Sequence, residues 1–150
     1  MTLLYILCAC FSMVCLHELS HVFMAELLVG VRSYKINLFP HRSPSLGSVS
    51  ASVSIWYERN PSEKEEAWVA FAPRVYDLLS CVAFLSTENP IIFALSCGGL
   101  ADLFIASTEI GKSDLLVYSK NWGLEYEETR KNTALFLVSV LALYSINQLG

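Results

Sequence analysis

Four stretches of mostly apolar residues dominate the chain and predict four helices that cross a membrane. They cover about residues 2–31, 67–86, 90–108 and 133–148. A helix needs about 20 mostly apolar residues to cross the hydrocarbon core, so the first stretch is long and the last is short. The alternative, a soluble all-helical protein with a very apolar core, stays open at this point. We expect a mainly α, polytopic (multi-pass) integral membrane protein in which residues 1–150 form a single membrane-embedded domain.

Between the first two stretches, the spacing of apolar residues changes from helical to alternating. Within residues 47–57, apolar residues alternate with serines over most of the segment, and a similar alternation runs through residues 34–38. Alternation with a period of two is typical of a strand with one buried face. We therefore predict a β-hairpin over about residues 33–57, with its turn at residues 40–45.

The basic residues lie almost entirely in the two long segments between apolar stretches. Residues 32–66 contain five Lys or Arg and residues 109–132 contain four, whereas the turn at residues 87–89 contains none. Cytoplasmic segments of membrane proteins are enriched in Lys and Arg. We therefore predict that both long segments are cytoplasmic and that both termini lie on the non-cytoplasmic side.

Composition agrees with a membrane protein and excludes one class of partner. Apolar residues make up 54% of the chain and charged residues 16%, with a net charge of −4. Soluble domains usually carry about 25% charged residues. A nucleic-acid-binding domain needs a basic patch or stripe, so we expect no nucleic-acid partner. The five cysteines lie in apolar runs without the CxxC spacing of a thiolate zinc site, and we interpret them as packing residues.

The first apolar stretch contains the sequence His17-Glu18-Leu19-Ser20-His21, an HExxH motif. Two histidines four residues apart on a helix project from one face, so both imidazoles can reach one metal ion. Glu18 points about 100° around the helix from His17 and can act on water beside the metal without being a ligand. This pattern is typical of zinc hydrolases, in which the metal activates water and the carboxylate transfers its proton. Placing ionisable groups without partners inside a membrane helix costs free energy, so their presence here favours a functional site.

A zinc site of this kind needs a third protein ligand and an open position. The extended pattern HExxHxxGxxH is absent, because Met24 and Leu27 occupy its Gly and His positions. The glutamates beyond Glu26 cluster in polar segments. The three aspartates, by contrast, lie in or beside apolar stretches, at Asp77, Asp102 and Asp114. We therefore expect an aspartate to complete the site.

The motif and its flanking residues resemble the site-two protease family of intramembrane zinc metalloproteases. Residues 17–31 are similar to the family pattern HExGH followed by xxxAxxxxG, with Ala25 and Gly30 at the matching positions and a predicted hairpin after them. The resemblance implies a compact member of the family without an inserted PDZ domain. It also implies a Zn²⁺ cofactor and a substrate that is a transmembrane segment of another membrane protein.

Weaker similarity to the same family continues downstream. Residues 72–77 resemble its Gly-Pro-x-x-Asn segment, residues 100–104 its Asn-Leu-Leu-Pro segment, and residues 113–115 its Leu-Asp-Gly segment, in which the aspartate is the third zinc ligand. Order and spacing within this resemblance favour Asp114 as the third ligand. Asp102 is the alternative, because it lies deeper in the third apolar stretch, as the histidines do in the first.

Arg74 and Asp77 have both a structural and a functional interpretation. Arg74 and Asp77 lie three residues apart on a predicted helix and can form an ion pair along it. Alternatively, Arg74, Asp77 or Asp102 could bind substrate or orient a metal-bound histidine. The pair Gly98-Gly99 predicts close packing of helices.

The main hypothesis is a zinc metalloendopeptidase that hydrolyses peptide bonds in or near transmembrane segments. His17, His21 and Asp114 would bind the metal, and Glu18 would be the catalytic base and acid. The Ser-faced hairpin could hold an unwound substrate strand by edge pairing. The alternative, from a different class, is a non-catalytic metal-binding membrane protein that acts as a partner-binding subunit.

Overall fold

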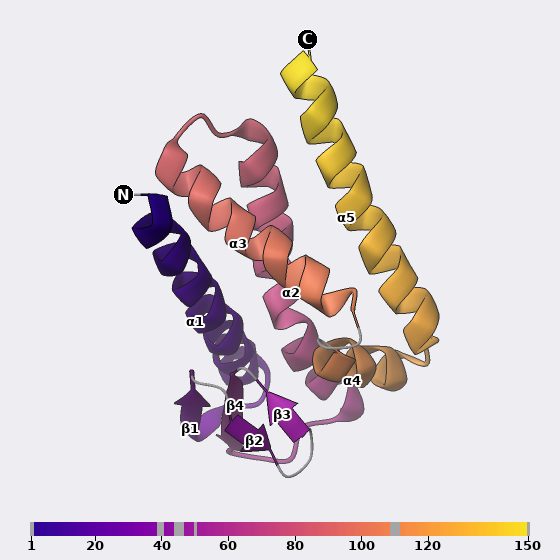
Figure 1. Cartoon of the computed structure of the whole chain (residues 1–150). Helices are drawn as coiled ribbons and strands as arrows, with labels where there is room; N and C mark the ends of the chain where they lie inside the picture. The colour runs from indigo at the N-terminus through magenta and orange to yellow at the C-terminus, as the bar shows by residue number, and fades with distance from the viewer. Residues whose placement is uncertain (1, 39–40, 44–46, 50, 109–111, 150) are drawn as a thin grey trace.

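The computed structural model describes residues 2–38, 41–43, 47–49, 51–108 and 112–149. Helices and short strands follow one another along these parts of the chain (Figure 1). In order they are α1 (Thr2–Leu28), β1 (Val31–Asn37), β2 (His41–Ser43), β3 (Gly47–Val49), β4 (Ser52–Tyr57), α2 (Glu63–Ser86), α3 (Pro90–Ala106), α4 (Lys112–Trp122) and α5 (Tyr126–Leu149). The predicted mainly α fold, with a β-hairpin between the first two helices, is confirmed.

A helix forms over each of the four apolar stretches, and local chemistry explains where the first two begin or end. α1 ends at Leu28 because Gly30 has a φ of 83° and turns the chain into β1. α2 begins at Glu63, before the apolar stretch itself, because Ser62 and Glu65 form a capping box. Each of these two side chains accepts a hydrogen bond from the backbone N–H of the other residue.

Two of these helices are long and apolar enough, by length and composition, to cross a membrane. They are the Leu7–Leu28 part of α1 and the whole of α2. α3 is a shorter apolar helix of 17 residues. Among the described residues, these two helices are the only candidates by this criterion. The four membrane spans expected from the sequence therefore stay a prediction.

The hairpin has a more divided structure than the sequence predicted. β1 pairs antiparallel with β4, and β2 pairs antiparallel with β3 in a second two-stranded sheet. The segment 47–57, predicted as one strand, is therefore split into β3 and β4. Residues 41–43, predicted to lie in the turn, instead form β2, whereas residues 40, 44 and 45 of that turn lie outside the described residues. From Val53 to Tyr57 the predicted alternation holds, because Val53, Ile55 and Tyr57 are half-buried and Ser54 is exposed. Ser52, which the alternation placed on the outer face, is half-buried as well.

α4 is the element that the sequence did not predict. The sequence placed residues 109–132 between two apolar stretches and predicted no helix there, yet α4 and the first residues of α5 lie within this segment. The physical reason is packing against α2: Leu115 is buried, and Tyr118 stacks on Phe71 with ring centroids 4.7 Å apart. These contacts stabilise a helix whose own sequence is only moderately apolar.

The pair Gly98-Gly99 lets α3 approach α1 and α2 closely. A Cβ atom on Gly99 would lie 2.3 Å from the Cβ of Ser80 in α2, and one on Gly98 would lie 3.2 Å from the Cβ of Met13 in α1. The predicted close packing at these glycines is confirmed. One turn further along α3, Asp102 reaches both neighbouring helices.

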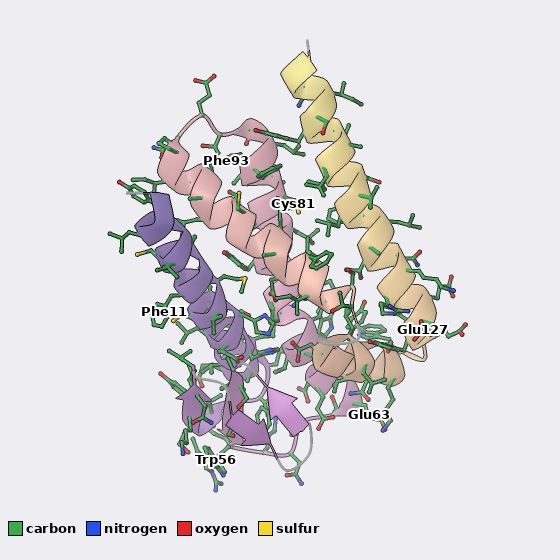
Figure 2. The ribbon with its side chains drawn as sticks, in the orientation of Figure 1. Phe11, Trp56, Glu63, Cys81, Phe93 and Glu127 are labelled. Atoms are coloured by element: carbon green, nitrogen blue, oxygen red, sulfur yellow. The ribbon has the colours of Figure 1, made fainter. Side chains whose placement is uncertain are left out.

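The hairpin and α4 lie at one end of the helix bundle, and both chain termini lie at the other (Figure 1). Figure 2 shows Trp56 projecting from the hairpin end and Glu63 at the start of α2 near the same end. The two segments rich in basic residues therefore meet at one end of the molecule. That this end lies on the cytoplasmic side of a membrane stays a prediction.

Candidate metal centre

His17 and His21 lie one turn apart on α1, with ring centroids 5.1 Å apart. Asp114, in the first turn of α4, completes a group with them. The Oδ2 atom of Asp114 lies 3.0 Å from Nε2 of His17 and 3.6 Å from Nε2 of His21. One potential ligand atom from each of these residues lies within 4.8 Å of the other two, so the group could hold a metal ion.

A hydrogen bond on the opposite ring nitrogen orients each imidazole. Nδ1 of His21 lies 2.7 Å from the carbonyl oxygen of Val69 in α2, and a carbonyl can only accept. Nδ1 of His21 therefore carries the hydrogen, and its Nε2 lone pair is left for a metal. Nδ1 of His17 lies 2.7 Å from Oδ2 of Asp102 and donates to that carboxylate in the same way. Such hydrogen bonds fix the tautomer and the ring orientation of metal-binding histidines.

Asp102 is therefore placed on the opposite side of His17 from Asp114. Its Oδ2 atom also accepts a hydrogen bond of 3.2 Å from Nη2 of Arg74 in α2. Arg74 forms the predicted ion pair with Asp77, which is fully buried. A buried charge is tolerated when it is paired, and here Arg74 lies between two carboxylates. The chain Asp77, Arg74, Asp102 and His17 links α2, α3 and α1 through polar contacts.

Glu18 lines a cavity of about 410 Å³, together with His17, His21 and Asp114. Its side chain is only 6% exposed. Among the described residues, no hydrogen bond or ion pair engages the Glu18 carboxylate. It is therefore available to a water molecule or a substrate in the cavity.

No family model, curated protein or solved structure matches the chain. The resemblance of residues 17–31 to the site-two protease family therefore stays a hypothesis. The arrangement of the side chains carries the functional conclusions.

β4 forms one wall of the cavity. Val53, Ile55 and Tyr57, which alternate along β4, line it together with Ser52 and with Ala51 just before the strand. β4 pairs with β1 along one edge, and no other described strand pairs with it. An unpaired strand edge can accept an extended peptide by backbone hydrogen bonding.

Several residues that line the cavity were not singled out from the sequence, among them Val69, Glu66 and Tyr57. Val69 acts through its backbone carbonyl, so its side chain carries no signal of that role. Glu66 lies in a polar segment, and its cavity position depends on where α2 begins. Tyr57 belongs to the predicted apolar face of the hairpin, which was the one usable signal. Burial and the negative charge of Glu66 both raise the pKa of the Tyr57 hydroxyl, which keeps it neutral.

Proposed function

We propose that this protein is an intramembrane zinc metallopeptidase that hydrolyses peptide bonds in or near transmembrane segments of membrane proteins. The observation that carries the proposal is the convergence of both Nε2 atoms and the Asp114 carboxylate beside the unengaged carboxylate of Glu18. Two imidazoles and one carboxylate form a ligand set of catalytic zinc sites, which leave a fourth position open. The similarity of residues 17–31 to site-two proteases supports the same reaction.

The donor set also supports zinc over the commoner divalent ions. Mg²⁺ and Ca²⁺ prefer oxygen ligands, whereas this group offers two imidazole nitrogens. The HExxH arrangement, with Glu18 beside the ligands, is the pattern of zinc-dependent hydrolysis. When bound, zinc supplies Lewis acidity, which polarises the scissile carbonyl and lowers the pKa of water.

The remaining chemistry belongs to the side chains of this protein. Glu18 takes the proton of the attacking water and then delivers it to the leaving amine, as a general base followed by a general acid. Asp102 and the Val69 carbonyl hold the two imidazoles in the required tautomer. Arg74, held by Asp77, keeps the Asp102 carboxylate on His17.

The edge of β4 away from β1, with which no other described strand pairs, supports binding of the substrate in an extended form. The peptide bonds of a transmembrane helix are shielded by its internal hydrogen bonds, so a substrate segment must unwind locally before hydrolysis. An unwound segment needs new partners for its backbone N–H and C=O groups. The edge of β4 that faces away from β1 offers such partners on the strand that lines the cavity of Glu18.

Purified protein in detergent is expected to cleave a transmembrane peptide, with the cut within or next to its apolar segment. Mass spectrometry of the products maps the site. A zinc chelator is expected to stop the reaction and added zinc to restore it, because the proposed reaction depends on the metal to polarise the scissile carbonyl. Protein that binds zinc but cleaves no transmembrane substrate would favour the alternative, a non-catalytic metal-binding subunit that binds a partner.

We further propose that all four long helices cross the membrane, with the hairpin and α4 on the cytoplasmic side. The position of both basic segments at one end of the bundle supports this path (Figure 1). In a variant without the native cysteines, a cysteine at Ser45 should react from the cytoplasmic side and one at Gly150 from the opposite side. Reaction of both from the same side would contradict the path.

A further inference from the structure

The cavity has an acidic wall that the proposed hydrolysis does not use. Glu66 lines it one turn before Val69 and Ala70, on the same face of α2. Its side chain is exposed, and its hydrogen-bond donor is Nδ2 of Asn121 at 3.5 Å, the outer limit for such a bond. Glu65, the preceding residue, is instead fully engaged by Arg59 and Ser62. Glu66 is therefore a weakly held carboxylate that faces the cavity.

Tyr57 lines the same cavity as Glu66, and the charge of Glu66 acts on the Tyr57 hydroxyl. Its side chain is half-buried at the end of β4, opposite Val31 of β1. An aromatic face next to a carboxylate favours a cation whose aliphatic stem can lie over the ring. Tyr57 and Glu66 together offer both surfaces.

The charges around the cavity point the same way. Its described lining contains the carboxylates Glu18, Glu66 and Asp114 and no Lys or Arg. Asp114 belongs to the metal group and Glu18 to the reaction centre. Glu66 is the remaining carboxylate, and no basic side chain of the described lining balances its charge. Nearby basic side chains are engaged elsewhere: Arg59 binds Glu65 and the carbonyl of Leu28, and Lys64 lies over the ring of Trp122.

We propose that Glu66 and Tyr57 select a Lys or Arg side chain of the substrate, close to the scissile peptide bond. The inference rests on the proposed peptidase function and narrows its substrates to segments with a basic residue at that position. Membrane segments carry Lys and Arg mainly at their cytoplasmic ends. An extended substrate on the edge of β4 passes Tyr57 where the strand ends, which brings such a side chain to Glu66.

Matched peptides and a charge-reversed variant test this specificity. The substrates are two series of transmembrane peptides, one with a single Lys and one with a single Glu. Within each series, this residue is placed in turn at each position on either side of the scissile bond. Wild-type protein is expected to prefer Lys over Glu at one position by about tenfold in kcat/KM, mainly through KM. Glu66→Lys is expected to reverse the preference at that position, and Glu66→Gln to reduce it to about one.

Glu63→Lys is the matched control, because Glu63 lies in the same first turn of α2 (Figure 2). Glu63 is not among the residues that line the cavity. The Glu63→Lys variant is expected to retain the wild-type preference. A shift as large as that of Glu66→Lys would assign the effect to long-range charge and overturn the proposal. Cleavage of all peptides without preference would overturn it while leaving the peptidase function intact. Absence of any cleavage by the wild type would overturn both.

Discussion

Replacing Glu18 with Gln is expected to abolish peptide cleavage while leaving zinc bound. The amide has nearly the same shape as the carboxylate but cannot accept the proton of the attacking water. General acid-base catalysis by one side chain usually contributes about 10²–10⁴-fold to the rate, and the loss should reach at least that range. Zinc should stay because Glu18 is not part of the group formed by His17, His21 and Asp114.

The measurement combines single-turnover cleavage with zinc content of the same Glu18→Gln sample. Glu26→Gln is the matched control, because Glu26 is exposed near the end of the same helix and accepts a hydrogen bond from the N–H of Val31. It lies outside the cavity and should cleave as the wild type does. Loss of zinc from Glu18→Gln would show that Glu18 is a ligand, which contradicts its assigned role.

Local patterns were enough to predict the parts of the structure that depend on one element. The spacing of His17 and His21 places both on one face of α1, and the ion pair of Arg74 with Asp77 follows from their spacing on α2. The alternation along β4 predicted which of its faces is buried. Each of these relations joins residues a few positions apart, where helix or strand geometry fixes the distance.

Contacts between distant segments could not be predicted in the same way. The hydrogen bond from His17 to Asp102 depends on how closely α3 approaches α1, and the one from His21 depends on the backbone of Val69. Asp114 reaches the histidines because α4 folds against α2, although its sequence carries only a weak helical pattern. The depth of Asp102 in its apolar stretch suggested it as the alternative metal ligand. Depth alone could not indicate that Asp102 would contact Nδ1 of His17, on the side of the ring away from the metal group.

Removing Asp114 is expected to weaken zinc binding far more than removing Asp102. Asp114 lies next to Nε2 of both histidines, whereas Asp102 contacts only Nδ1 of His17. Loss of a side chain that merely orients a ligand typically costs about 10–100-fold in metal affinity, which is the range expected for Asp102→Ala. Asp114→Ala removes one of three ligands, and the loss should exceed about 100-fold.

Conservative variants separate ligation from folding. Asp102→Asn keeps a hydrogen-bond acceptor near His17, so it should lose less affinity than Asp102→Ala. Asp77→Asn alters the same buried network without contacting either histidine, and it shows how far a change in that network alone lowers stability and zinc affinity. Equal and small effects of Asp114→Ala and Asp102→Ala would favour a non-catalytic protein.

One zinc ion per chain, held by His17, His21 and Asp114, is the claim on which the proposed function depends. Elemental analysis and X-ray absorption spectroscopy of carefully purified wild type and Asp114→Ala test it most directly. The wild type should contain about one zinc per chain, with nitrogen and oxygen ligands at about 2.0–2.2 Å that include two imidazoles. Asp114→Ala should lose most of this zinc. Wild-type protein without a transition metal, or a greater loss of zinc in Asp102→Ala than in Asp114→Ala, would contradict the claim.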